Sequence, residues 1–328
     1  MTQHAEPDRV VAMSDTVWRY LHTHALHAAR SIGDRAAEAN ARRVLASALF
    51  WRGSVSEALT HLERAMELYE AVGDLSLQAA TSNNIGAVCR QRGNLAEAAD
   101  WFRRAMALYD EVGDQRLRSP VTYNLAELLT LLRRYDEARE LYEHGLVNAR
   151  KYGNRVNEAS SLCGLAEVSV RLGRHRSALE YGRQATTLAQ AVNDRFLECE
   201  AMRAVGAAHL GLGEHDIAIR QLDSALRLAR ALGEADDVVA VLNGLAAAHA
   251  AAGHPAEAIT LYREAMVTDE YGYREERAHA ATGLGDVHAG LGEHDQAREH
   301  WRRALTICRE LGLPHANDVT TRLETVHT

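Results

Sequence analysis

The sequence repeats itself every 40 residues, and this period constrains the fold more than any other feature. Small residues recur at two positions of the repeat. The first set is Ala58, Ala98, Ala138, Ala178, Ala218, Ala258 and Ala297, and the second is Ala25, Ala65, Ala105, Gly145, Ala185, Ala225, Ala265 and Ala304. One deletion near Tyr271 accounts for the shift by one residue in the last repeat. Chains with repeats of this length stack their units into arrays without a central core.

Glycines form two ladders, half a period apart, that predict where helices end. One ladder follows the second helix of each pair, at Gly33, Gly73, Gly113, Gly153, Asn193, Gly233, Gly272 and Gly312. The other separates the paired helices, at Gly53, Gly93, Arg133, Gly173, Gly213, Gly253 and Gly292. Glycine and asparagine readily adopt the left-handed conformation that ends a helix. In the unit 79–113 we therefore expect one helix to end near Arg92 and a second to run from about Leu95 to Val112.

The period predicts an all-α protein, a right-handed superhelical α-solenoid with seven helix pairs and a half repeat at each end. We expect a disordered lead at residues 1–10 and one solenoid domain over residues 11–328. Within that domain the half repeat covers residues 11–33, the full repeats about 39–312, and a closing helix 318–327. An alternative for the first residues is that they mark where a longer protein was cut.

Composition excludes several classes of function. The formal net charge of −8 argues against a general nucleic-acid-binding surface, which needs clustered positive charge. The only lysine, Lys151, is not part of a phosphate-binding loop. No apolar run approaches the length of a membrane span, so we expect a cytoplasmic protein without membrane contact. The four cysteines lack metal-binding spacing and are expected to be reduced and partly buried: Cys89, Cys163, Cys199 and Cys308.

The repeat unit resembles a tetratricopeptide repeat. Ile85 and Gly86 in the first helix, with Ala98, Phe102 and Ala105 in the second, match the small-residue and aromatic skeleton of that family. In such a unit the small residues let two helices approach closely while the aromatic ring fills the space between them. The 40-residue spacing is similar to the long-repeat subfamily that includes kinesin light chain and bacterial peptide-sensing regulators.

The C-terminal segment is similar to the end of the tetratricopeptide arm in AfsR-like and SARP-type regulators of actinobacterial antibiotic pathways. The resemblance rests on Ala297 and Trp301, followed by the Leu-Gly-Leu-Pro turn at residues 311–314 and a short closing helix. In those proteins a DNA-binding domain and an NB-ARC nucleotide-binding switch precede the arm. The resemblance implies that the arm senses a ligand or protein that controls the switch.

First helices of such repeats line the inner wall of the superhelix. The inward candidates for binding a ligand are Arg43, Asn83, Asn84, Tyr123, Asn124, Glu127, Glu167, Arg203 and Asn243. Asparagine is a poor helix-interior residue, but it presents both a donor and an acceptor. The resemblance implies that Asn84 and Asn124 hold the main chain of an extended peptide. The alternative is that these asparagines only bond to neighbouring backbone or to each other.

A ladder of histidines, His209, His249 and His288, occupies equivalent places in successive repeats. Equivalent helices lie about 8–10 Å apart, too far for their ring nitrogens to share one ion at about 2 Å. We therefore expect core or interfacial histidines and no metal site. The sequence also lacks a zinc-protease motif, a nucleophile elbow and a phosphate loop, so we expect neither an enzyme nor a cofactor.

The leading hypothesis is a non-catalytic sensor arm that binds a peptide, protein or small ligand on its concave face. The arm would regulate an attached transcriptional-regulator or NB-ARC ATPase module, and the regulator's own domains are candidate partners. The alternative is a stand-alone adaptor or scaffold protein. Self-association into a homodimer through exposed second helices is also left open.

Overall fold

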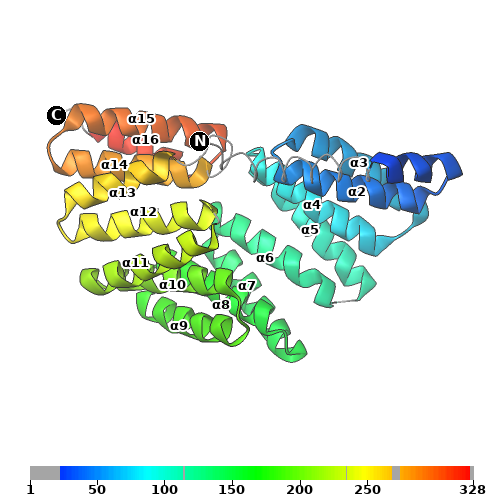
Figure 1. The fold of residues 1–328 in the computed structure, drawn as a ribbon, viewed down its shortest axis with the longest axis horizontal. Coiled ribbons are helices and arrows are strands. Elements are labelled where there is room, and N and C mark those ends of the chain that lie inside the picture. The colour runs from blue at the N-terminus through cyan, green and yellow to red at the C-terminus, as the bar shows by residue number, and fades with distance from the viewer. Residues whose placement is uncertain (1–22, 114, 234, 268–273, 326–328) are drawn as a thin grey trace, which may run out of the picture. The chain divides into compact units, whose positions relative to one another are not determined.

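The computed structural model describes residues 23–113, 115–233, 235–267 and 274–325. This part of the chain contains helices and turns but no strand, so the predicted all-α class is confirmed. Residues 23–32 are helical. Fifteen further helices follow (Figure 1). They are α2 Arg35–Trp51, α3 Val55–Val72, α4 Leu75–Gln91, α5 Leu95–Val112, α6 Gln115–Leu131, α7 Tyr135–Tyr152, α8 Arg155–Arg171, α9 His175–Ala191, α10 Arg195–Gly211, α11 His215–Leu232, α12 Ala235–Ala251, α13 Pro255–Val267, α14 Arg274–Gly290, α15 His294–Glu310 and α16 Ala316–Thr325.

The helices pack in the order that a tetratricopeptide solenoid requires. Pairs such as α4 and α5 or α8 and α9 pack together, and second helices also contact the first helix that follows, as α3 contacts α4 and α7 contacts α8. First helices contact one another in succession, α8 with α10, α10 with α12 and α12 with α14. The even-numbered helices α8 to α14 therefore form one continuous layer. Helices α2 to α15 make up the seven predicted pairs.

The small residues at the first repeat position are fully buried. All seven alanines of that set, from Ala58 to Ala297, have an exposed fraction of 0%. Gly86 shows why small residues are needed, because a Cβ built there would lie 2.6 Å from Cε1 of Phe102. The predicted close approach of the paired helices is confirmed. For the second set, the prediction is wrong at its first member. Ala25 is exposed, and Leu26 and Ala29 are buried instead.

Both predicted glycine ladders have the left-handed backbone. Every glycine of the two ladders that lies in the described chain has a positive φ, between 63° and 83°. The two positions where the ladders lack glycine, Arg133 and Asn193, also have positive φ, 60° and 55°. Gly272 and the deletion near Tyr271 lie outside the described residues. The left-handed conformation thus recurs at every described ladder position, even where the residue is not glycine.

Short polar residues start the first helices. The Asp74 side chain accepts a hydrogen bond from the backbone N–H of Leu77, and the Asn154 side chain accepts one from Asn157, each at 3.0 Å. These bonds satisfy donors that would otherwise have no partner at a helix N-terminus. Helix α5 follows the predicted bounds, and α4 ends one residue before Arg92.

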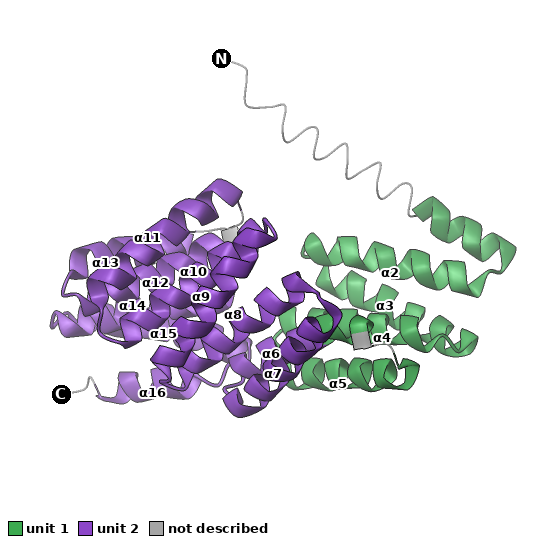
Figure 2. Cartoon of the chain, turned by 90° about the horizontal axis from the view of Figure 1, so that it is seen from below, with its two compact units in different colours: residues 1–121 green, residues 122–328 purple. Residues whose placement is uncertain are grey.

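The chain divides into two compact units, residues 1–121 and residues 122–328 (Figure 2). The division falls within α6, after Val121 and so one residue beyond Pro120. Proline has no N–H to donate to the preceding turn, so α6 has one backbone hydrogen bond fewer at this point. The expectation of one solenoid domain over residues 11–328 stays a prediction. The expected lead at residues 1–10, and residues 11–22 of the half repeat, lie outside the described residues.

The C-terminal end of unit 2 is closed by α16, which begins two residues before the predicted closing helix. Val319 of α16 is buried against Trp301 and the neighbouring alanines of α15. Among the described helices, none is both long and apolar enough to cross a membrane.

Candidate ligand-binding face

Six of the nine predicted binding residues lie on first helices of unit 2, and three lie in unit 1. Unit 2 contains Tyr123, Asn124 and Glu127 on α6, Glu167 on α8, Arg203 on α10 and Asn243 on α12. Unit 1 contains Arg43 on α2 and Asn83 and Asn84 on α4. Several of these residues occupy the same place in the repeat, since Tyr123, Arg203 and Asn243 are separated by multiples of 40 residues.

The polar residues of unit 2 form what we call the inner cluster. Its members come from five first helices, α6, α8, α10, α12 and α14, and all are buried or half-buried. They are Tyr123, Glu127, Glu167, Glu200, Arg203, Asn243 and Glu276. Two of them, Glu200 and Glu276, are not among the nine predicted residues.

Arg203 is the central cation of the inner cluster. Its Nη2 lies 3.5 Å from Oε2 of Glu167, and Nη2 of Arg171 lies 3.6 Å from the other oxygen of that carboxylate. Burial alone would raise the pKa of Glu167, but the charges of Arg203 and Arg171 lower it below its usual range. Glu167 is therefore ionised at neutral pH and paired with two arginines.

Glu200 has a different environment. The hydroxyl of Tyr123 donates a hydrogen bond of 3.3 Å to its Oε1. Burial raises the pKa of Glu200 to about 7, and the negative charges of Glu127 and Glu167 act in the same direction while Arg203 opposes them. Near neutral pH this carboxyl group therefore gains or loses a proton in response to small changes in its surroundings.

Glu276 is held in the ionised state by its neighbours. Asn243 Nδ2 donates to Oε2 of Glu276 at 2.7 Å and to its backbone oxygen at 2.9 Å, and Nδ1 of His279 lies 3.6 Å from Oε2. Burial would raise the pKa of Glu276, but these contacts and the charge of Arg203 lower it to about 2. Asn243 thus ties α12 to the first turn of α14. Its Oδ1 is buried and has no hydrogen-bond partner among the described residues.

Two tyrosines and a cysteine lie near the α6 and α8 members of the inner cluster. Tyr123 packs edge-on against Tyr142, with ring centroids 5.8 Å apart. Burial raises the pKa of both hydroxyls well above their usual range. Cys163 takes the place of Tyr123 in the next repeat, and burial raises the pKa of its thiol as well. These groups stay protonated at neutral pH, so they can donate hydrogen bonds but do not act as nucleophiles.

The unit 1 candidates lie on α2 and α4. Nη2 of Arg43 donates to Oδ1 of Asn40 at 3.2 Å, and its guanidinium opposes the rise in the pKa of Tyr69 that burial causes. Asn83 and Asn84 are half-buried on α4. In unit 2, Asn124 is half-buried on α6, directly after Tyr123. Contact of these asparagines with a ligand stays a prediction.

Two histidines of the ladder occupy buried positions, and the third is half-buried. His209 and His288 are buried, and Nδ1 of each lies 2.5 Å from Oε2 of the glutamate five residues later, Glu214 and Glu293. Each pair links the end of a first helix to the residue directly before the second helix. His249 instead lies against His254, with ring centroids 5.7 Å apart. No group of three or more metal-ligating side chains is found in the described part of the chain.

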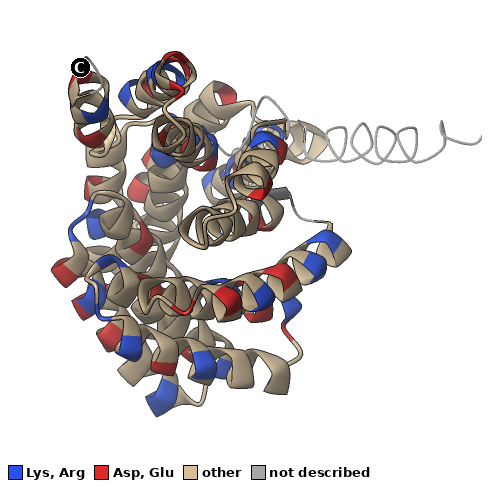
Figure 3. Cartoon of the chain, turned by 90° about the vertical axis from the view of Figure 1, so that its left-hand side faces the viewer, with Lys and Arg blue, Asp and Glu red and all other residues tan. Residues whose placement is uncertain are grey.

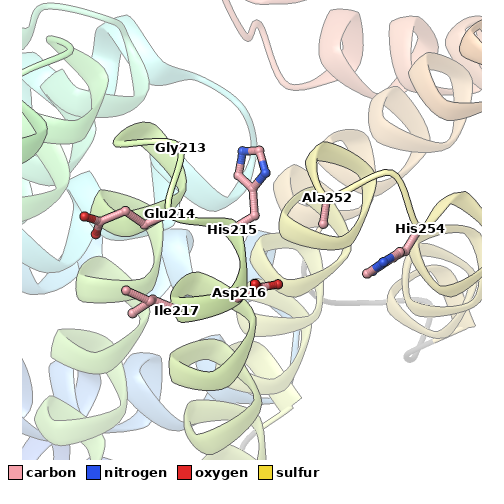
Figure 4. A pocket seen from close by; sticks show the side chains of 7 residues that line it. All are labelled: Gly213, Glu214, His215, Asp216, Ile217, Ala252 and His254. Atoms are coloured by element: carbon pink, nitrogen blue, oxygen red, sulfur yellow. The ribbon is translucent and has the colours of Figure 1, made fainter.

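A surface hollow of about 400 Å³ lies where α11 begins, beside the turn after α12 (Figure 4). It is lined by Gly213, Glu214, His215, Asp216, Ile217, Ala252 and His254. None of the nine predicted residues is among them. The hollow is formed by the ends of helices, so it does not share the first-helix face on which the inner cluster lies.

Comparison with known families identifies the repeat. A sequence profile of the tetratricopeptide repeat matches residues 37–111, 118–191 and 197–266, and a second such profile matches residues 277–312. The chain belongs to the tetratricopeptide repeat family. The family resemblance based on Gly86 and Phe102 is thereby confirmed. Comparison with curated proteins found no significant match.

Solved structures share this fold. A Rap protein complexed with competence and sporulation factor is 16% identical, with a TM-score of 0.63 over 84% of this chain and 76% of that protein. The Rap conjugation gene regulator of the plasmid pLS20, in complex with the Phr* peptide, is 12% identical, with a TM-score of 0.66 over 92% and 79%. A signal transduction ATPase with numerous domains from Pyrococcus horikoshii, which has a tetratricopeptide repeat sensor, is 16% identical. Its TM-score is 0.58, over 88% of this chain and 44% of that protein.

Proposed function

We propose that this chain is a non-catalytic interaction arm that binds a peptide or a protein segment on the inner face of its first helices. The observation that carries the proposal is the inner cluster, in which five first helices of unit 2 bring polar side chains to one face. An extended peptide offers a donor and an acceptor at every residue. The carboxylates and the amide carbonyl of this face can accept hydrogen bonds from such a segment.

The solved structures support a peptide as the ligand class. The plasmid regulator of the same fold is described in complex with the Phr* peptide. At 12% identity the likeness extends to the fold, so it does not define which residues of this chain would contact a peptide. The nine predicted residues, together with Glu200 and Glu276, are our candidates.

We further propose that the arm regulates an attached module, either a DNA-binding transcriptional regulator or an NB-ARC type ATPase. The resemblance of residues 297–314 to the arm of AfsR-like and SARP-type regulators supports this role. So does the Pyrococcus horikoshii ATPase, in which a tetratricopeptide sensor is part of a longer protein. The regulator's own domains are then additional partners. The alternative is a stand-alone adaptor that scaffolds other proteins, with or without self-association.

Direct contact with nucleic acid is not part of the proposal. Figure 3 shows acidic and basic residues intermingled along the helices, and the formal net charge is −8. Phosphate backbones are bound by clustered positive charge. An acidic regulatory arm would act on DNA only through an attached domain.

Two experiments test the two parts of this proposal. For binding, the separate variants Asn84→Ala and Asn124→Ala should bind arrayed peptides more weakly than the wild type while their melting temperatures stay within a few degrees of it. An equal loss of melting temperature and binding would show that the asparagines are structural.

For the attached module, an immunoblot of native cells with an antibody against residues 79–311 measures the size of the endogenous protein. A band well above the size of 328 residues supports a regulatory arm. A band at that size contradicts the attached module and favours the adaptor.

A further inference from the structure

The inner cluster has more negative charge than its cations balance. Glu167 has two arginines close to it, whereas Glu200 and Glu276 share Arg203 with it. Glu276 is also stabilised by Asn243 and His279. Glu200 has only the shared guanidinium and one hydrogen bond from the Tyr123 hydroxyl, and it is exposed to the repulsion of two other carboxylates. Glu200 is thus the carboxylate that would gain most from a further positive charge.

A second, independent feature of the cluster is an acceptor without a donor. Asn243 has an exposed fraction of 9%, and its Nδ2 is engaged by Glu276. Oδ1 of the same amide is buried and has no hydrogen-bond partner in the described chain. A buried carbonyl oxygen without a donor is unfavourable, so this atom marks a place where a donor is missing.

We propose that the inner cluster binds a protonated nitrogen group of a peptide, which pairs with Glu200 and donates to the Oδ1 of Asn243. This inference rests on the proposed peptide-binding function and names the chemistry that it would select. The donors of Arg203 and Tyr123 already face carboxylates of the cluster, so the ligand must bring donors of its own. An arginine side chain has five N–H donors in a planar fork, and a lysine or a free N-terminus has three.

The same geometry disfavours other ligand groups. A carboxylate of a ligand would meet Glu127, Glu167 and Glu200 as like charges in a half-buried setting. A neutral amide could satisfy the Asn243 carbonyl but would leave the charge of Glu200 unpaired. A cation serves both groups, and charge-assisted hydrogen bonds are about twice as strong as neutral ones.

The test uses an array of acetylated hexapeptides in matched pairs, in which each arginine of one peptide is replaced by citrulline, its uncharged isostere, in the other. A third set has a free N-terminus and no basic side chain, and a fourth has lysine. We expect the full chain to bind the strongest arginine or lysine peptide about tenfold or more tightly than its neutral partner, about 1.4 kcal/mol. If only the third set binds, the recognised nitrogen is the terminal amine and not a side chain.

The variant that tests the assignment is Glu200→Gln, which keeps the shape and the hydrogen bond from Tyr123. It should reduce the preference for the charged peptide to within about twofold. The matched control Glu180→Gln removes an exposed carboxylate on α9 and should retain the full preference. A second readout, independent of any variant, is calorimetry of the strongest peptide in two buffers of different ionisation enthalpy at pH 7. Proton release on binding is expected, because pairing with a cation keeps Glu200 ionised.

Equal binding of charged and neutral peptides, with no proton release, would overturn this inference while leaving peptide binding intact. Absence of binding to every peptide set would overturn the proposed function as well as the inference.

Discussion

The guanidinium of Arg133 forms an ion pair with the carboxylate of Asp318, although 185 residues separate them in the sequence. Arg133 lies in the turn between α6 and α7, and Asp318 lies in α16. The first turn of unit 2 and its last helix therefore touch. A second pair, in which Arg322 of α16 donates from both Nε and Nη2 to Asp286 of α14, holds the same helix. The closing helix is thus fixed to two different repeats.

Removal of α16 should cost much more stability than loss of the ion pair alone. Both Arg133 and Asp318 are close to half-exposed, and exposed pairs contribute about 0–1 kcal/mol. Asp318→Asn should therefore lower the free energy of unfolding by less than about 1 kcal/mol. Deletion of residues 316–328 uncovers Trp301, which is 3% exposed in the structure, and should lower the melting temperature by several degrees. Thermal unfolding followed by circular dichroism measures both, and equal losses would contradict this account of the closing helix.

The two left-handed residues that are not glycine predict an unusual response to mutation. At Asn193, with φ 55°, a substitution to Gly should be neutral or slightly stabilising, and a substitution to Ala should cost about 1 kcal/mol. Gly173→Ala is the matched control, because φ is 71° there and a Cβ would meet no atom within 4 Å. It should cost about the same as Asn193→Ala. Urea denaturation gives the differences, and a stabilising Asn193→Ala would show that the turn is not held in the left-handed conformation.

Two glycines of α14 should behave in opposite ways when a methyl group is added. A Cβ at Gly285 would overlap the indole of Trp301, whereas a Cβ at Gly290 would meet nothing within 4 Å. Gly285→Ala should therefore destabilise the protein by about 1–3 kcal/mol through overpacking. Gly290→Ala should be neutral or stabilising by up to about 1 kcal/mol, because alanine favours a helix. If the two variants had the same melting temperature, Trp301 would not be packed against α14.

Glu200 should make the stability of the protein depend on pH around neutrality. Its pKa is raised from 4.5 to about 7 in the folded chain, so the folded state keeps a proton that the unfolded state loses. Protonation of Glu200 thus contributes about 3 kcal/mol to the free energy of unfolding. This contribution is fully present below pH 4.5 and is lost as the pH rises through 7. The groups that set this pKa are Tyr123, Glu127, Glu167 and Arg203.

The variant Glu200→Gln removes this titration. Its free energy of unfolding relative to that of the wild type should therefore rise from pH 5 to pH 8. Urea denaturation of both proteins at the two pH values isolates the effect, because the other groups titrate in both. A stability difference that is the same at pH 5 and pH 8 would contradict the burial and charge assigned to Glu200. The pKa of Glu276 is lowered to about 2, so its effect on stability has the opposite pH dependence. The stability that it contributes is lost only as the pH falls from 4.5 toward 2.

The helix ends could be predicted from the sequence because the signal at each end is local. A left-handed residue stops a helix whatever lies beyond it, and the 40-residue phase located even Arg133 and Asn193. The buried alanines were predicted for the same reason, since the phase assigns each to a contact between helices. Ala25 is the exception, since it is exposed and no other helix of the described chain covers it.

The inner cluster could be predicted only in part. Sequence periodicity placed Glu167, Arg203 and Asn243 on first helices, but it contains no information about which side chains meet across three helices. Glu200 lies one turn before Arg203 on the same helix face, and that spacing was the available signal. Glu276 follows the deletion near Tyr271, where the repeat phase is lost. That Asn243 bonds to Glu276 depends on side-chain geometry, which a period does not define.

The most direct test of the central claim is to locate a bound peptide on the chain. The strongest peptide from the array, carrying a photoreactive benzophenone side chain, is crosslinked to the intact protein, and the attachment sites are identified by mass spectrometry. We predict attachment on first helices, in α4, α6, α8, α10, α12 or α14, and loss of attachment when unlabelled peptide competes. Competed attachment confined to the second helices α7, α9, α11 or α13 would contradict binding at the inner face.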